Sequence, residues 1–381
     1  MHLVVNAFFW NQPHTGSGQY VRQLVSWLDR LVSDLKITLI VPTGPDKSDL
    51  DQLPEKVSVL EKQIRPGHLG KVYFEQIVFP RECRSLGADV AHIPYWGAPL
   101  QSHLPLVVTV HDVTPLIVRE YRRGLKARLY TALVSASARS AGHIITDSDS
   151  SMGDIKQHLA IDDAGITPIY LAAAPECSPE SDFLLDMAIA KKYKMPEEYV
   201  LYLGGYEIHK NLETLLLAYT FVNKAVGQEI PLVLAGNKPA MAGNHFPDYD
   251  KQISEVGLME SVHWTGTIDE ADKPSIYRGA KSFAFPSKYE GFGLPPLEAM
   301  ACGVPVVASN SSSLPEVVGS AGFTLDPDDY RQFGGSIIAT LVQEELAAEM
   351  RRKGLEQAAK FSWEKTATET LAIYDSLVSG R

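Results

Sequence analysis

The sequence predicts an α/β protein with two doubly wound, parallel-sheet domains. Three observations support this class. The chain has 381 residues, which exceeds what a single hydrophobic core normally holds, so two domains are expected. Short apolar runs bounded by turn residues alternate with longer amphipathic stretches, the pattern of repeated βαβ units. Several of these runs are continuously β-branched, as expected for parallel strands covered on both faces.

The first half of the chain carries one series of strands. We expect strands at Leu3–Ala7, Ile37–Val41, Val57–Leu60, Val90–Ile93, Leu106–His111, His143–Asp147 and Ile166–Leu171. Helices are expected at Gln19–Val32, where apolar residues recur at helical spacing, and at Lys126–Ser140. Residues 1–172 are therefore assigned to an N-terminal Rossmann-like domain.

A stretch rich in proline and small polar residues then interrupts the pattern, and residues 173–190 are assigned to a linker. A second series follows in residues 191–362, the expected C-terminal Rossmann-like domain. Its strands are expected at Tyr199–Leu203, Leu232–Ala235, Val262–Thr265, Phe283–Pro286, Val304–Ala308 and Phe323–Leu325. Its helices are expected at Leu212–Val226, Pro296–Ala301, Tyr330–Leu346 and Ala347–Lys360.

Residues 363–381 form a last expected helix that packs back on the N-terminal domain. In doubly wound sheets, ligands bind beyond the carboxyl ends of the strands, so a cleft that the two domains face is the expected site.

Composition excludes several classes. The formal net charge of −11 argues against nucleic acid as a general partner. The three cysteines lie far apart, without the spacing of a disulfide framework or a structural zinc site. The first ten residues lack the features of a secretion signal, and no apolar run approaches eighteen residues. A cytoplasmic enzyme is expected.

The stretch Glu290–Ser309 is the most informative part of the sequence. Gly291 and Gly293 let the backbone approach a ligand closely, and Pro295 and Pro296 suit the first positions of a helix. The N–H groups and dipole of that helix would form a site for a phosphate. A glycine-rich turn between strand and helix is also ordinary α/β structure, and only the combination of features is specific.

Two carboxylates flank this turn. Glu298 is expected in the first helical turn, where it would accept hydrogen bonds from sugar hydroxyls, and Glu290 would approach the same ligand from the other side. A glutamate at a helix start also simply complements the helix dipole.

Two further places in the first half are candidates for ligand contact. Gly16, Ser17 and Gly18 precede a helix and are interpreted either as a flexible loop that approaches a ligand or as a plain turn. The third glycine of a dinucleotide fingerprint is missing there, so NAD binding is not expected. His111 and Asp112 follow an apolar strand, which favours a role in the site over local capping by Asp112.

In the second half, Lys210 lies just before a helix that Asn211 is expected to cap. A lysine at that junction either neutralises a phosphate or is a surface charge. Two Asp-x-Asp triplets, 147–149 and 326–328, favour turn and cap chemistry over metal binding, so no metal is expected.

A basic stretch in the first half has two interpretations. It is a contact with an anionic membrane surface, or it is a solvated helix face, as such charge runs more often are. Its basic residues are Arg119, Arg122, Arg123, Lys126 and Arg128.

The spacing Glu290-x7-Glu298, within EGFGLPPLEAMACGVPVVAS, resembles the signature of family 4 retaining glycosyltransferases, which have the GT-B architecture. The stretches GSGQY, VHDVTPL, HKNLETLLLAY and SLPEVVGSAGF occur in the family's order over nearly the whole chain. The resemblance implies that Glu298 binds the donor ribose and that Lys210 neutralises the diphosphate. One departure is Gly205, which stands where many members carry an arginine.

The same resemblance implies further roles. His111 would approach the transferred sugar, which makes it a candidate catalytic residue together with Lys210 and Glu290. Residues 16–18 would close over the phosphates. Glu290 would hold the donor sugar and diphosphate together with the backbone of Gly291, Phe292, Gly293 and Leu294.

The sequence therefore predicts a retaining, metal-independent hexosyltransferase of polysaccharide biosynthesis, cytoplasmic or peripheral on the inner membrane face. The donor is a nucleotide sugar, with UDP-hexose favoured and GDP-mannose next, and no other cofactor is expected. The acceptor is a glycan or a lipid-linked saccharide. The alternatives are a sugar-nucleotide epimerase of the same fold and a non-catalytic nucleotide-sugar binding protein.

Overall fold

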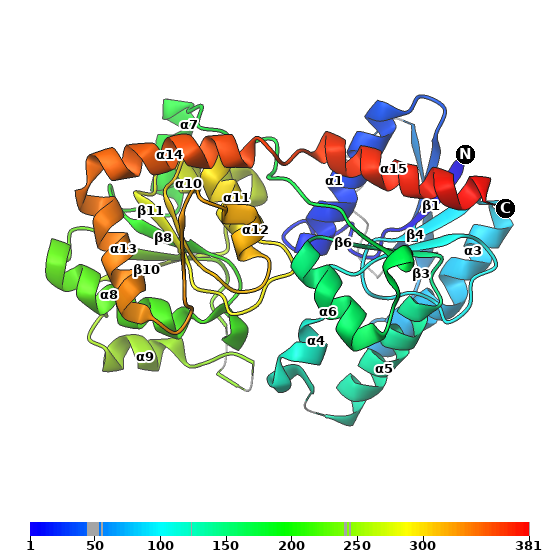
Figure 1. Ribbon diagram of the computed structural model, residues 1–381, viewed down its shortest axis with the longest axis horizontal. Helices are drawn as coiled ribbons and strands as arrows, with labels where there is room; N and C mark the ends of the chain where they lie inside the picture. Colours follow the sequence, from blue (N-terminus) through cyan, green and yellow to red (C-terminus); the bar gives the residue numbers. More distant parts are fainter. Residues whose placement is uncertain (44–52, 55, 123, 240–241, 244, 381) are drawn as a thin grey trace. The chain divides into compact units, whose positions relative to one another are not determined.

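The computed structural model describes residues 1–43, 53–54, 56–122, 124–239, 242–243 and 245–380. The chain divides into two compact units, and each has its own parallel sheet (Figure 1). The first unit combines Met1–Leu171 with Ser362–Arg381, and the second is Ala172–Phe361. The predicted fold class, two parallel-sheet α/β domains, is confirmed.

The first unit contains, among the described residues, a seven-stranded sheet in the order β3-β2-β1-β4-β5-β6-β7. Its strands are β1 (His2–Asn6), β2 (Lys36–Thr43), β3 (Val57–Gln63), β4 (Val90–Ile93), β5 (Leu106–Thr109), β6 (His143–Thr146) and β7 (Ile166–Pro168). Strands β1, β4 and β5 are buried along their whole length, which explains their continuous apolar sequences. The strand order reverses between β1 and β4, and the carboxyl ends of such a pair form the usual ligand site.

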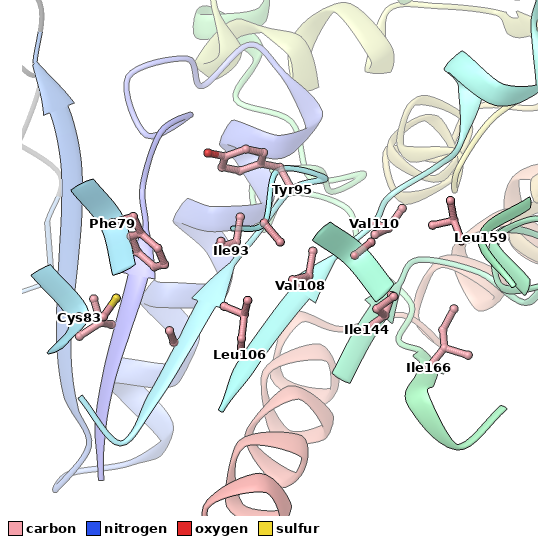
Figure 2. Packing of buried hydrophobic residues seen from close by; sticks show 14 of the residues in the cluster. Phe79, Cys83, Ile93, Tyr95, Leu106, Val108, Val110, Ile144, Leu159 and Ile166 are labelled. Atoms are coloured by element: carbon pink, nitrogen blue, oxygen red, sulfur yellow. The ribbon is translucent and has the colours of Figure 1, made fainter. Parts of the chain in front are cut away.

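The helices of the first unit cover this sheet. They are α1 (Gly16–Leu31), α2 (His68–Tyr73), η1 (Phe74–Val78), α3 (Phe79–Ser85), α4 (Thr114–Ile117), η2 (Arg119–Arg122), α5 (Leu125–Arg139), α6 (Asp149–Leu159) and η3 (Asp163–Gly165). The helical run His68–Ser85 was not among the expected elements. Phe79 and Cys83 of α3 belong to the same apolar core cluster as Ile93 of β4, Leu106 and Val108 of β5 and Ile144 of β6 (Figure 2).

The last helix, α15 (Trp363–Ser379), belongs to the first unit and packs against α1 (Figure 1). Its buried Tyr374 hydroxyl lies 2.6 Å from Nδ1 of His92 in β4. His92 Nε2 lies 2.8 Å from the hydroxyl of Thr109, which in turn lies 3.1 Å from that of Tyr20. A buried polar chain therefore ties α15, β4, β5 and α1 together.

The second unit contains a six-stranded sheet in the order β10-β9-β8-β11-β12-β13 within the described part of the chain. Its strands are β8 (Val200–Leu203), β9 (Leu232–Ala235), β10 (Val262–Gly266), β11 (Ser282–Phe285), β12 (Val306–Ser309) and β13 (Phe323–Leu325). The order reverses between β8 and β11, so the loops after these two strands meet at the ligand-binding edge.

Its helices are α7 (Phe183–Lys192), η4 (Ile208–Lys210), α8 (Leu212–Val226), α9 (Tyr249–Glu255), η5 (Glu270–Asp272), α10 (Lys273–Arg278), α11 (Leu294–Ala301), α12 (Leu314–Val318), α13 (Tyr330–Val342) and α14 (Glu344–Ala358). The segment 173–190, expected as a linker, lies in the second unit and contains most of α7. Asp186 of α7 accepts a 2.6 Å hydrogen bond from Arg278 of α10, which holds this helix on the unit. None of the helices in the described ranges is long and apolar enough to cross a membrane.

Candidate functional site

The loop between β11 and α11 has the shape that its glycines and prolines predict. Gly293 is the N-cap of α11 and has φ +130°, a conformation that favours glycine. A Cβ on Gly293 would also come within 2.9 Å of the Leu314 side chain. Pro295 and Pro296 are the second and third helical residues. Because proline has no N–H, this helix start offers a phosphate fewer backbone donors than the sequence analysis assumed.

Two serines brace the loop from the segment between β12 and α12. The Ser312 hydroxyl accepts a 2.8 Å hydrogen bond from the backbone N–H of Glu290. The buried hydroxyl of Ser313 donates to the carbonyl oxygens of Glu290 and Phe292. Sequence reasoning did not single out either serine for this role. The signal was present in the polar run that precedes α12, since hydroxyl side chains there often bond to backbone groups.

Lys210 and Glu290 form an ion pair. The ammonium nitrogen of Lys210 lies 2.7 Å and 3.0 Å from the two carboxylate oxygens of Glu290, and both side chains are largely buried. The lysine ends η4 after β8, and the glutamate follows β11, so the pair lies at the reversal point of the sheet. A diphosphate that binds the ammonium group of Lys210 would either share this group with the Glu290 carboxylate or displace the carboxylate from it.

Glu298 is buried within α11. It is 4% exposed and accepts a 2.9 Å hydrogen bond from the hydroxyl of Tyr277 in α10. Burial raises the pKa of Glu298, while the positive charge of Lys273 acts in the opposite direction. Glu298 is the fifth residue of α11, so the expectation that it lies in the first turn is wrong. The helix begins at Leu294, before the two prolines, with Gly293 as its N-cap residue.

Gly205, where the sequence departs from the family pattern, lies beside the side chain of Glu207. A Cβ on Gly205 would lie 2.1 Å from a carboxylate oxygen of Glu207. That oxygen is buried and has no hydrogen-bond partner among the described residues. The end of the Glu207 side chain would therefore have to shift to admit a larger residue at position 205.

Asn211 does not cap α8 with its side chain. Its backbone is in the left-handed region, with φ +59°, and its amide nitrogen donates to the carbonyl oxygens of Pro286 and Pro327 at 3.0 Å and 2.7 Å. Asn211 is the N-cap residue of α8, as the sequence predicted, but its side-chain oxygen accepts a hydrogen bond from the hydroxyl of Thr214 instead of from a backbone N–H. Asn211 instead ties the start of α8 to the loops after β11 and β13.

In the first unit, Gly16, Ser17 and Gly18 form the first turn of α1, so the interpretation as a flexible loop is wrong. Thr15 is the N-cap, and its hydroxyl accepts a 3.1 Å hydrogen bond from the N–H of Gly18. A Cβ on Gly18 would lie 2.0 Å from the carbonyl oxygen of Gln12, whereas Gly16 faces open space. The second glycine is therefore required by close backbone packing.

His111 lies two residues beyond β5, at the carboxyl edge of the first sheet. Its Nδ1 lies 2.7 Å from a carboxylate oxygen of Asp147, and its Nε2 lies 3.2 Å from the carbonyl oxygen of Pro94. Asp112 accepts a 2.7 Å hydrogen bond from the N–H of Thr114, which is the local capping that the sequence left open. His111 therefore contacts Asp147 and not Asp112, its neighbour in the chain.

A second buried ion pair lies in the first unit. The carboxylate of Glu75 is fully buried, and the ammonium group of Lys71 lies 3.8 Å from it. Burial raises the pKa of Glu75 to about 7 and lowers the pKa of Lys71. The ammonium nitrogen also lies 5.1 to 5.4 Å from the ring centroids of Phe8, Phe9, Tyr95 and Tyr130.

The two Asp-x-Asp triplets have structural partners. Ser148 caps α6 by accepting a 3.0 Å hydrogen bond from Ser151, and Asp326 accepts one of 2.9 Å from the N–H of Asp328. In the described ranges, no group of three or more acidic, histidine or cysteine side chains could hold a metal ion.

The basic stretch is only partly described. Arg119 begins η2 and the exposed Arg128 lies in α5. Arg123 lies outside the described residues, as do the side chains of Arg122 and Lys126.

At one edge of its sheet the second unit therefore combines a lysine, the carboxylate paired with it and a braced glycine-rich helix start, while the carboxylate of Glu298 lies buried farther along that helix. A lysine and backbone N–H groups bind phosphates, and carboxylates accept hydrogen bonds from hydroxyls. This set of groups suits a ligand that carries both phosphates and sugar hydroxyls.

Comparison with known proteins agrees with this chemistry. A family model for glycosyl transferases group 1 matches residues 188–357, and one for glycosyltransferase family 4 matches residues 14–175. The chain is 35% identical over 380 residues to the O-antigen chain mannosyltransferase B of Escherichia coli, which covers 96% of this chain and 97% of that protein. It is 31% identical over 265 residues to the serotype-specific mannosyltransferase WbdA of Escherichia coli, covering 68% of this chain and 32% of that protein.

Solved structures share the fold. Sucrose-phosphate synthase from Thermosynechococcus elongatus has a TM-score of 0.80 at 21% identity, with 100% of both chains covered. HepE of Anabaena in complex with UDP-glucose has a TM-score of 0.75 at 18% identity, with 99% of both chains covered. At these identities the likeness shows the architecture and leaves the substrate open.

Proposed function

This chain belongs to the family 4, group 1 glycosyltransferases, and from that premise we propose that it transfers mannose from a nucleotide sugar to a growing saccharide, with retention at the anomeric carbon. The observation that carries the proposal is the match to the O-antigen mannosyltransferase over nearly the full length of both proteins. That protein's name supports mannose as the transferred hexose and a polysaccharide precursor as the acceptor.

The second unit would bind the donor. In this proposal Glu298 accepts hydrogen bonds from the ribose hydroxyls, and Glu290 contacts the sugar. Lys210 neutralises the diphosphate together with the backbone N–H groups of the loop at residues 291–294. The support for these roles is the convergence of the groups at the edge where β8 and β11 end.

The first unit would contribute His111 and the start of α1 at residues 16–18. His111 approaches the transferred sugar, and the N-terminal turn of α1 approaches the phosphates. Both lie beyond carboxyl ends of strands in the first sheet, where ligands bind in this class of fold.

Retention is proposed to follow a front-face path. The bond between the anomeric carbon and the diphosphate oxygen breaks, and the acceptor oxygen bonds to the same face of that carbon. The acceptor proton passes to the departing diphosphate oxygen. Lys210 and the positive end of the α11 dipole stabilise the negative charge that develops on the diphosphate. This scheme needs no divalent metal.

The donor base is proposed from the relatives. The sequence favoured UDP-hexose over GDP-mannose. We propose GDP-mannose as the first donor to test, because the relatives are named mannosyltransferases. A lipid-linked acceptor would bring the enzyme to the membrane surface, where the described Arg119 and Arg128 would face anionic headgroups.

The test is a donor screen followed by a transfer assay. Purified protein is melted with GDP-mannose, UDP-glucose and other nucleotide sugars, because a ligand that binds the folded state raises the melting temperature. The donor that binds is then incubated with mannose-terminated oligosaccharides, with and without EDTA, and the anomeric configuration of the product is read by NMR.

The expected result is an α-linked product from an α-linked donor, formed equally well in EDTA. A β-linked product would refute retention, and complete loss of transfer in EDTA would refute metal independence. Epimerised donor in the absence of an acceptor would instead identify an epimerase. Binding without any reaction across the acceptors would indicate a binding protein.

A further inference from the structure

His111 is enclosed by hydrogen-bond acceptors on both ring nitrogens. An ionised carboxylate and a carbonyl only accept hydrogen bonds, and a neutral imidazole carries a single N–H. The contacts of Nδ1 with Asp147 and of Nε2 with the Pro94 carbonyl are therefore both satisfied only when the ring is doubly protonated. The geometry by itself favours an imidazolium at this position.

The buried carboxylate of Asp147 needs the positive charge of a doubly protonated His111 to be stable. Asp147 is 3% exposed, and its second carboxylate oxygen has no hydrogen-bond partner among the described residues. A buried carboxylate without an opposite charge is costly, so the imidazolium of His111 stabilises it. Burial acts to lower the pKa of His111, but the charges of Asp147 and Asp112 and the hydrogen bond to Asp147 raise this pKa above its ordinary value.

The other titratable groups around the ring do not supply this charge. Burial holds the pKa of His92, in β4, at about 3, so its imidazole is neutral. The ring of Tyr20, in α1, packs edge-on against His111 at 5.0 Å, and burial raises the pKa of its hydroxyl well above neutrality. The charged groups that act on His111 are therefore Asp147 and Asp112, which follows His111 in the chain.

The two hydrogen bonds of His111 differ in strength. The contact with Asp147 is short and charge-assisted, whereas the contact of Nε2 with the Pro94 carbonyl is 3.2 Å long. A ligand oxygen can therefore replace the carbonyl at Nε2 without disturbing the pair. The His111 side chain is 19% exposed, at the carboxyl edge of the sheet.

We propose that Asp147 is a positioning residue of the transfer reaction, which holds His111 doubly protonated so that Nε2–H donates a hydrogen bond to an oxygen of the sugar nucleotide. Asp147 itself does not touch the substrate. The inference rests on the proposed function, because it assigns His111 to the sugar nucleotide. It also explains why one acid of the Asp147-Ser148-Asp149 triplet is buried while its neighbour Asp149, which accepts from the Tyr170 hydroxyl, lies at the surface.

The first measurement needs no activity. The histidine side chains of the full-length protein are labelled with ¹³C and ¹⁵N, and the His111 signals are assigned with a His111→Gln variant. In the wild type, the titration midpoint of His111 is expected above that of a free histidine. Asp147→Asn is expected to lower it by roughly one to three pH units, the effect of removing an opposite charge at hydrogen-bonding distance.

The second measurement follows kcat and KM for the sugar nucleotide against pH. In Asp147→Asn, the pH at which kcat falls on the alkaline side is expected to move to a lower value, by as many pH units as the NMR midpoint of His111 does. Activity then falls at least ten-fold at pH 8 and much less at pH 6, while the KM for the acceptor is unchanged. Asp147→Glu should restore part of the profile, and Asp149→Asn, the matched control two residues away at the start of α6, should follow the wild type.

A wild-type His111 midpoint below that of free histidine overturns the proposal without any variant. An Asp147→Asn enzyme that loses activity equally at every pH also overturns it, because a purely structural role has that signature. If no sugar nucleotide supports transfer, the proposed function fails, and the NMR midpoints still decide whether Asp147 holds the charge on His111.

Discussion

The buried Glu75 carboxylate should make the stability of the first unit depend on pH. Burial raises its pKa from 4.5 to about 7, so the folded protein binds this proton more tightly than the unfolded chain does. The stability that this group contributes is fully present below pH 4.5 and is lost as the pH rises through 7. We predict that Glu75→Gln removes this dependence.

The size of the effect follows from the pKa. A rise from 4.5 to about 7 corresponds to roughly 3 kcal/mol between the protonated and ionised forms. For a domain of this size, that is a change of about 6 to 12 °C in melting temperature. The lowered pKa of Lys71 acts in the opposite direction, because it adds stability as the pH rises above the pKa of the folded state. Since Lys71 is present in both proteins, the comparison of the wild type with Glu75→Gln isolates the contribution of Glu75.

The assay is thermal unfolding from pH 5 to pH 8.5, in parallel for the wild type and Glu75→Gln. The variant is expected to have nearly the stability of the wild type at pH 5, where Glu75 is protonated and neutral like glutamine, and to gain on the wild type as the pH rises through 7. Glu82→Gln is the matched control, since Glu82 lies on the same helical run but pairs with Lys62 at the surface. Parallel curves for the wild type and Glu75→Gln would refute the reasoning.

Three further outcomes are expected. Lys210→Ala should lower kcat roughly a hundred- to thousand-fold, which is the usual effect of losing one group that stabilises developing charge. The control Lys288→Ala removes an exposed lysine that pairs with Asp328, and it should leave kcat unchanged. Equal losses of kcat in the two variants would contradict the role assigned to Lys210. Gly18→Ala should lower the melting temperature by several degrees, since the new Cβ would lie 2.0 Å from a carbonyl oxygen. Gly16→Ala should leave the melting temperature unchanged, because Gly16 faces open space. Calorimetry on both variants measures the two melting temperatures. Tyr374→Phe should cost about 1 to 3 kcal/mol in urea unfolding, because it leaves Nδ1 of the buried His92 without a hydrogen-bond partner. An unchanged urea midpoint would show that this contact contributes nothing.

The strands were predictable because their sequences reflect burial. Val90–Ile93 and Leu232–Ala235 have the same bounds in the sequence analysis and in the structure, and so has the helix Leu212–Val226. A parallel strand buried on both faces leaves a continuous apolar run that turn residues delimit sharply. The fold class follows from the repetition of such runs.

The partners within the sites were not predictable in this way. His111 and Asp147 are 36 residues apart, and they meet because β5 and β6 are neighbours in the sheet. Nothing in the local sequence encodes that adjacency, so His111 was grouped with Asp112, its neighbour in the chain. The side chain of Asn211 was misplaced for the same reason, since its partners Pro286 and Pro327 are 75 and 116 residues away.

The return of α15 to the first unit has a consequence for synthesis on the ribosome. The first sheet is complete by Pro168, yet Tyr374, which closes the polar chain under β4, is translated 282 residues after His92. During that interval His92 lacks this partner and the face of α1 that α15 covers is exposed to solvent. The second unit, Ala172–Phe361, is contiguous in the chain and is able to fold first. The domain that begins the chain is therefore the last to be finished.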